Sequence, residues 1–177
     1  MRKRIAIDMD ETVCDSLLRH IEWYNKQFGT QLTKEDTAGK RIYHVIPEEH
    51  VAAVKSYPHH PDFFRDLVVF DDAIESIKTL SEQYDIFFVT AAMEYPTSFQ
   101  AKYEWLKQHF PFIHELNYVF CGDKSIINAD YLIDDTPKHL ATFDGEGLLF
   151  HAFHNMHATG FQRVHSWKEI LETLRLD

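Results

Sequence analysis

Short apolar runs alternate with amphipathic stretches along most of the chain. The first run, at residues 5–7 (Ile-Ala-Ile), is apolar throughout, as expected of a strand buried on both faces of a parallel sheet. Similar runs follow at residues 86–90, 118–121, 131–133 and 148–150. Between most of these runs, apolar residues recur every three or four positions, which predicts helices. Strands and helices that alternate in this way predict an α/β fold, with a mostly parallel sheet covered by helices on both faces.

Local signals indicate where the predicted helices begin and end. Asp15 is placed to cap a helix whose apolar residues recur at helical spacing, and Gly29 is placed to end it. The helix before the second predicted strand is expected to begin at Asp71 or Asp72, since a short acidic side chain can accept from the first free backbone N–H groups. A further helix is predicted over residues 97–110, where a proline follows.

The regular pattern weakens between residues 30 and 69, where polar and aromatic residues mix and one helix is predicted at 48–57. We interpret residues 16–69 as a small helical cap inserted after the first strand. Residues 1–15 and 70–177 then form the core, a Rossmann-like parallel sheet with helices on both faces.

Polar side chains stand at or just beyond the ends of four predicted strands. They are Asp8 and Asp10, Thr90, Lys124, and Asp134 with Asp135. The carboxyl ends of parallel strands share one edge of a sheet, so we expect these side chains to meet in one crevice. Two like charges about 4 Å apart repel by roughly 4 kcal/mol at an effective dielectric near 20, so clustered carboxylates favour a bound cation. Oxygen ligands alone indicate Mg²⁺.

The same residues fit metal-assisted transfer of a phosphoryl group. In this scheme Asp8 attacks phosphorus, while Asp10 protonates the leaving oxygen and later deprotonates the water that hydrolyses the intermediate. Lys124 and Thr90 supply an ammonium and a hydroxyl to the phosphate oxygens that the metal does not reach. Each residue alone has an ordinary explanation, as a helix cap, a surface lysine or a strand residue, so the prediction depends on their shared position.

Composition and charge exclude some classes of function and partner. The chain has 177 residues, of which 45% are hydrophobic, which suits a single globular unit with a substantial core. It carries 18 Lys plus Arg against 28 Asp plus Glu and no long basic run, so polymeric nucleic acid is not an expected partner. Only three apolar residues follow the basic residues 2–4, too few for a signal peptide or a membrane span. We therefore expect a cytoplasmic protein without a membrane partner, and the cap aromatics could serve a homodimer as readily as a ligand.

The four polar motifs, in the order Asp8-Met9-Asp10, Thr90, Lys124 and Asp134-Asp135, resemble those of the haloacid dehalogenase-like phosphohydrolases. More narrowly, the chain resembles the 5'(3')-deoxyribonucleotidases over nearly its whole length outside the cap. The similar segments are residues 61–64 (PDFF), 102–106 (KYEWL), 123–125 (DKS), 129–135 (ADYLIDD), 154–155 (HN) and 165–167 (HSW).

This resemblance implies a ligand set for both the metal and the phosphate. Mg²⁺ would be bound by the Asp8 side chain, the Asp10 backbone carbonyl and the Asp135 carboxylate, with Asp134 supporting a metal-bound water. The groups implied to hold the phosphate are Thr90, the Ala91 amide and Lys124. The resemblance also implies that the cap closes over a nucleotide.

Two residues depart from the pattern of these families. Glu11 stands where a glycine is common, and Ser16 stands where the deoxyribonucleotidases place an aromatic residue against the base. Other cap aromatics could stack on the base instead, although such residues more often pack against the core. Phe64 is our candidate among them.

His151, His154 and His157 recur every three residues, but no carboxylate is expected beside them, so a second metal site is not predicted. We expect His154 and Asn155 to brace a neighbouring loop instead.

The leading hypothesis is a Mg²⁺-dependent phosphatase that hydrolyses (deoxy)ribonucleoside 5'- or 3'-monophosphates through an aspartyl-phosphate. A phosphatase for a phosphosugar or another small phosphomonoester is the alternative within enzymes. From a different class, a receiver-like phospho-acceptor signalling domain uses similar groups. A receiver, however, places its acceptor Asp after the third strand and has no cap, whereas here the late pair Asp134-Asp135 follows Thr90 and Lys124. A module that only binds is a third alternative.

Overall fold

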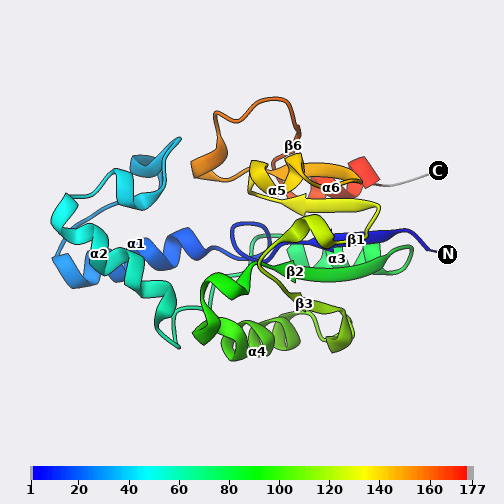
Figure 1. The fold of residues 1–177 in the computed structure, drawn as a ribbon, viewed down its shortest axis with the longest axis horizontal. Coiled ribbons are helices and arrows are strands. Elements are labelled where there is room, and N and C mark those ends of the chain that lie inside the picture. The colour runs from blue at the N-terminus through cyan, green and yellow to red at the C-terminus, as the bar shows by residue number, and fades with distance from the viewer. Residues whose placement is uncertain (1, 175–177) are drawn as a thin grey trace.

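The fold is an α/β sandwich built on one six-stranded sheet, described for residues 2–174 by a computed structural model (Figure 1). All neighbouring strands are parallel, in the order β3-β2-β1-β4-β5-β6. The strands are β1 (Arg4–Ile7), β2 (Asp85–Thr90), β3 (Tyr118–Phe120), β4 (Tyr131–Asp134), β5 (Glu146–Phe150) and β6 (Gln162–Val164). This confirms the predicted parallel sheet. The strand order reverses between β1 and β4, which is the switch point where doubly wound sheets bind ligands.

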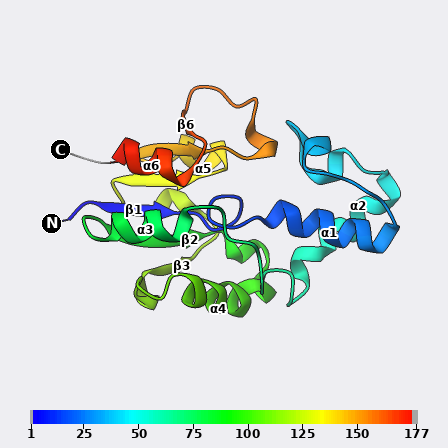
Figure 2. The ribbon, with the colours of Figure 1, turned by 180° about the vertical axis from the view of Figure 1, so that it is seen from behind.

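Helices cover both faces of the sheet, as predicted (Figures 1 and 2). The helices are α1 (Ser16–Phe28), α2 (Glu48–Ser56), α3 (Ala73–Ser81), α4 (Phe99–His109), α5 (Pro137–Ala141) and α6 (Trp167–Leu174). Ile5 and Ile7 of β1 share one buried cluster with residues of α3, α4 and α6. Ala6, between them, belongs to the cluster on the opposite face, which includes Leu140 of α5. Alternate residues of a strand point to opposite faces, which explains why residues 5–7 are apolar without interruption.

The segment between β1 and α3 lies beyond the carboxyl ends of the central strands (Figures 1 and 2). It holds α1, α2 and the 3₁₀ turns η1 (Glu35–Thr37), η2 (Ile42–His44) and η3 (Tyr57–His59). The predicted ends of α1 are confirmed: the Asp15 carboxylate accepts from the Leu18 amide at 2.8 Å, and Gly29 has a left-handed φ of 65°. The structure thus confirms that helices are inserted after the first strand.

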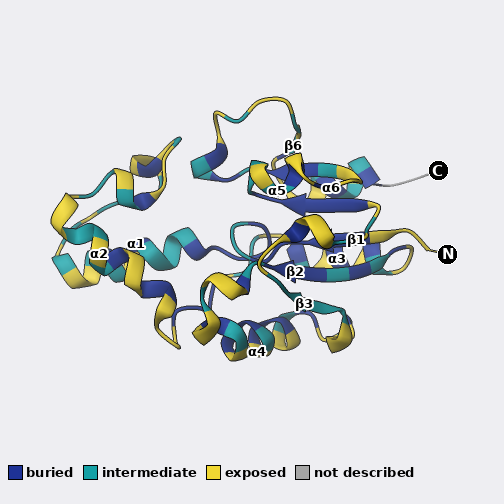
Figure 3. Ribbon diagram, in the orientation of Figure 1, coloured by how far each residue is buried: buried dark blue, intermediate teal, exposed yellow. Residues whose placement is uncertain are grey.

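Four elements differ from expectation. Asp72 does precede α3, but its φ is 61° and its side chain pairs with Lys168 at 3.1 Å instead of capping the helix. The strand β6, of only three residues, and the helices α5 and α6 were not predicted. The buried residues in Figure 3 concentrate on the strands and on the inner sides of the helices. Within residues 2–174, none of the helices combines the length and apolar character that crossing a membrane requires.

Candidate active site

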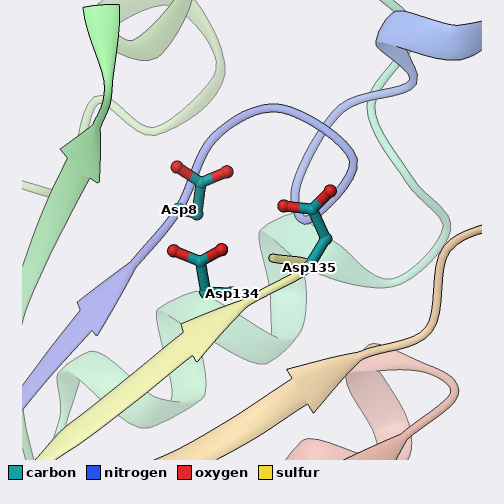
Figure 4. Close-up of side chains that lie close together, drawn as sticks. All are labelled: Asp8, Asp134 and Asp135. Atoms are coloured by element: carbon teal, nitrogen blue, oxygen red, sulfur yellow. The ribbon is translucent and has the colours of Figure 1, made fainter. Parts of the chain in front are cut away.

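Three carboxylates meet at the switch point between β1 and β4 (Figure 4). Asp8 follows β1, Asp134 ends β4 and Asp135 is the next residue. Asp8 donates its backbone N–H to the Ile133 carbonyl at 2.9 Å, which ties the two strand ends together. All three side chains are buried, and one oxygen of each lies within 4.8 Å of the others. The sheet therefore brings together three of the four predicted carboxylates.

Lys124 lies among these carboxylates and is only 1% exposed. Its ammonium donates to Asp8 Oδ1 and, at 2.7 Å, to Asp134 Oδ2. The loop that carries Lys124 is held by Asp123, whose carboxylate accepts from the Ser125 amide at 2.9 Å. Burial alone would lower the pKa of Lys124, but the charges of Asp8 and Asp134 outweigh it and raise that pKa. Lys124 therefore stays protonated and supplies a fixed positive charge.

The three carboxylates differ in how well their charges are compensated. Burial raises the pKa of Asp8 to about 6 even though Lys124 opposes the shift. The pKa of Asp134 is lowered, because Lys124 and His139 together outweigh its burial. Burial, reinforced by the charges of Asp134 and Asp8, raises the pKa of Asp135 well above its usual range. Negative charge at Asp135 is thus under-compensated by the protein, which is the condition that favours a bound cation.

Thr90 and Asp10, the other predicted side chains, are joined by a lysine that was not predicted as a site residue. Lys102 on α4 donates to Thr90 Oγ1 at 2.9 Å and to Asp10 Oδ2. Lys102 is 1% exposed. A signal was present in the sequence, because Lys102 shares the buried side of α4 with Trp105 and Leu106. A lysine at an apolar helix position is almost never fully buried without a charged partner.

A cavity of about 310 Å³ opens in front of these groups. Asp8, Asp10 and Asp135 line its inner end, together with Ala91. The outer wall comes largely from the helical segment and from the loop after β2, and includes Arg41, Phe63, Phe64 and Tyr95. Its volume lies at the lower end of the range for small-molecule sites. Phe64, our candidate for base contact, lines this cavity but is only 2% exposed, and its ring centroid lies 4.4 Å from Lys102 Nζ.

Glu11 and Ser16, the two residues that depart from the family pattern, contact each other. Ser16 Oγ donates to Glu11 Oε1 at 2.9 Å, and the Leu17 amide donates to the same oxygen at 2.6 Å. Glu11 has a φ of 55°, a left-handed conformation that favours glycine. Burial, and then the charge of Asp15, raises the pKa of Glu11 to about 7. Glu11 thus accepts hydrogen bonds from the first turn of α1, and it also lines the cavity.

The prediction that His154 and Asn155 brace a neighbouring loop is confirmed for Asn155. Its Nδ2 donates to the Asp135 carbonyl at 2.7 Å and to the Phe150 carbonyl at 2.8 Å, while Arg163 donates to its Oδ1 at 2.7 Å. His154 Nε2 lies 3.3 Å from Asp135 Oδ2, so the expectation that no carboxylate lies beside these histidines was wrong. Burial lowers the pKa of His154 to about 4, so this ring is neutral and does not compensate Asp135.

Comparison with known proteins gives consistent matches over nearly the whole chain. The family described as "5' nucleotidase, deoxy (Pyrimidine), cytosolic type C protein" matches residues 2–176. A Staphylococcus epidermidis relative is 46% identical over 169 residues, covering 96% of this chain and 94% of its own. The 5'(3')-deoxyribonucleotidase of Bacillus subtilis is 37% identical over 172 residues, covering 96% and 97% of the two chains. A HAD-hydrolase of Bacillus subtilis, solved bound to magnesium, has the same fold with a TM-score of 0.64 at 13% identity, covering 99% of each chain.

Proposed function

The chain belongs to the family of cytosolic type C 5' nucleotidases, and from that premise we propose that it hydrolyses (deoxy)ribonucleoside 5'- or 3'-monophosphates with Asp8 as the nucleophile. Membership makes it a phosphatase that acts on phosphomonoesters. The observation that carries the proposed chemistry is the buried cluster of Asp8, Asp134 and Asp135 with Lys124. Asp8 and Asp135 of this cluster line a cavity that is also lined by aromatic residues.

Mg²⁺ fits the donor set of this cluster. Asp135 is buried beside Asp8 and Asp134, and the His154 ring, whose Nε2 lies 3.3 Å from Asp135 Oδ2, is neutral. The two Asp134 oxygens already accept from Lys124, His139 and the Thr136 amide, so Asp134 suits a supporting role rather than a direct metal contact. We assign the Asp8 and Asp135 carboxylates and the Asp10 backbone carbonyl as the metal ligands. When bound, Mg²⁺ supplies positive charge to the phosphate oxygens and offsets the negative charge of the attacking carboxylate.

Asp8 would act as the nucleophile in its ionised form. With a pKa of about 6, its carboxylate is mostly deprotonated near neutral pH. One oxygen of Asp8 forms a bond to phosphorus, and the bond from phosphorus to the nucleoside oxygen breaks. Asp10 gives a proton to that leaving oxygen and then takes one from the water that attacks the aspartyl-phosphate, which releases inorganic phosphate and restores both residues. Lys124, the Thr90 hydroxyl and the Ala91 amide would hold the transferring phosphoryl oxygens.

Residues 16–69 are proposed to act as a cap over a core formed by residues 1–15 and 70–177. In support, Arg41, Phe63 and Phe64 of this segment line the same cavity as Asp8 and Asp135. The nucleoside would then lie against the aromatic wall, with Phe64 as the candidate for base contact. A cytoplasmic location agrees with the word cytosolic in the family description.

A panel of phosphomonoesters tests the proposal. Deoxy- and ribonucleoside 5'- and 3'-monophosphates of each base are incubated with the protein, with Mg²⁺ or with EDTA, and inorganic phosphate is measured. Small sugar phosphates form the comparison set. We expect Mg²⁺-dependent release from nucleotides, and release mainly from sugar phosphates would contradict the nucleotide assignment. A stable acyl phosphate formed from acetyl phosphate, without turnover, would support a signalling domain instead.

A further inference from the structure

Lys102 is a fully buried lysine whose ammonium contacts three groups around the site. It donates to Asp10 Oδ2 and to Thr90 Oγ1, and its Nζ lies 4.4 Å from the centroid of the Phe64 ring. These groups come from the loop after β1, the end of β2 and the inserted helical segment. One side chain of α4 thus connects three of the parts of the chain that line the cavity; the segment after β4 is a fourth.

The contact with Asp10 determines how its carboxylate is held. Asp10 stands in the turn between β1 and α1, where its side chain is 31% exposed. Lys102 holds Oδ2, whereas Oδ1 has no hydrogen-bond partner among residues 2–174. Within that part of the chain, Lys102 is therefore the group that orients this carboxylate. A general acid must stand within hydrogen-bond reach of the oxygen it protonates, so the orientation of Asp10 governs proton transfer.

The contact with Thr90 has a different consequence. A lysine ammonium has only donors, so at Thr90 it occupies a lone pair of the hydroxyl oxygen and leaves the hydroxyl proton free. That proton can then be donated to a phosphate oxygen.

Resting on the proposed function, we propose that Lys102 is the positioning residue for Asp10, and that it fixes this carboxylate for proton transfer to the leaving nucleoside oxygen. Lys124 does not share this role, since its ammonium is engaged by Asp8 and Asp134. The effect of Lys102 therefore depends on whether the leaving oxygen needs a proton.

The test compares two substrates that differ in this need. A deoxynucleoside 5'-monophosphate must leave as a protonated alcohol, whereas p-nitrophenyl phosphate leaves as a stable anion. The rate of alcohol or phenol release is measured in the first turnover by rapid quench, with Mg²⁺ present, for the wild type and for Lys102→Met. We expect Lys102→Met to slow nucleoside release by about 100-fold, the lower limit for general acid catalysis, and nitrophenol release by less than about 5-fold.

Two further variants serve as comparisons. Lys107→Met removes a lysine of the same helix whose side chain is 61% exposed and pairs with Glu115 at 3.0 Å, so both rates should remain unchanged. Thr90→Val removes a proposed phosphate contact and should slow both substrates alike. If Lys102→Met does not fold, Lys102→Gln is measured in its place, because its shorter amide cannot reach Asp10 as the ammonium does.

A double-mutant cycle gives an independent readout. Because Lys102 is proposed to act through Asp10, adding Lys102→Met to Asp10→Asn should slow nucleoside release by less than about 3-fold further. Equal losses on both substrates in Lys102→Met, or a full additional loss in the double variant, would overturn the inference. Failure of the proposed function is distinguishable, because the wild type would then release no nucleoside at all.

Discussion

Lys124→Met offers a quantitative test of the charge balance at the strand ends. The Lys124 side chain is fully buried, as is that of Asp134, and the Asp8 side chain is 9% exposed. Removing the ammonium leaves two buried carboxylates without their cation. Breaking one partner of a buried ion pair costs about 3–5 kcal/mol, much more than a surface pair. We expect that loss in the free energy of unfolding of the metal-free protein.

The assay is urea unfolding followed by circular dichroism, first in EDTA. If the same variant is unfolded by heat, a loss of 3–5 kcal/mol in a chain of this length corresponds to a fall in melting temperature of about 6–20 °C. The control is Lys107→Met, which removes an exposed pair and should change stability by less than about 1 kcal/mol.

Repeating the measurement with Mg²⁺ tests whether these carboxylates form the metal site. A ligand at about 100 times its dissociation constant stabilises the folded state by about 2.7 kcal/mol. Because Lys124→Met removes a positive charge beside the proposed ligands, Mg²⁺ should stabilise this variant more than the wild type. A loss below about 1 kcal/mol in EDTA, or no stabilisation by Mg²⁺ in either protein, would refute the reasoning.

Two other residues give further predictions. Burial lowers the pKa of His20 to about 4 in the folded state. As pH falls from about 6.5 to 4, His20 therefore becomes protonated in the unfolded chain but stays neutral in the folded protein, which favours unfolding. Stability should therefore decline over that range by at most about 3 kcal/mol, and less because the ring is half-buried. The difference between the urea midpoints at pH 7 and pH 5 should shrink in His20→Gln but should not vanish, because the pKa of His154 is also lowered to about 4; an unchanged pH dependence would contradict this. Asn155→Ala removes the donors to the Asp135 and Phe150 carbonyls, so we expect about 1–3 kcal/mol lower stability by urea unfolding. The Mg²⁺ affinity of this variant, measured by calorimetry, should fall about 10–100-fold, because Asn155 holds the backbone of the proposed ligand Asp135. An affinity equal to that of the wild type would show that Asn155 does not orient Asp135.

The sequence predicted the sheet and the strand-end carboxylates because both depend on local pattern. A buried parallel strand is apolar on both faces, so the change to Asp8 or Asp134 marks the strand end by itself. Parallel pairing then implies that these ends meet, since all carboxyl ends lie at one edge. The contact of Asp8 with Lys124 follows from this topology although 116 residues separate them.

Features that depend on tertiary packing were not predicted. Lys102 meets Asp10 across 92 residues, and knowing which side of α4 faces the loop after β1 requires the folded structure. Glu11 was noted only as a departure, whereas its pairing with Ser16 depends on its left-handed backbone. The strand β6 is too short for its alternation to be recognised. The helix α6 did carry a signal, because Trp167, Ile170 and Leu174 have helical spacing.

The central claim is that Asp8 attacks the phosphorus of a nucleotide. The most direct measurement is to quench the Mg²⁺-loaded protein in acid during turnover of a deoxynucleoside 5'-monophosphate and to map phosphorylated peptides by mass spectrometry. The Asp10→Asn variant, which should hydrolyse the intermediate slowly, is measured beside the wild type, and Asp8→Asn is the control. The account predicts an acid-stable, hydroxylamine-sensitive phosphate on Asp8, and neither label nor turnover in Asp8→Asn. Nucleoside release by Asp8→Asn at the wild-type rate, or phosphate on another residue, would contradict it.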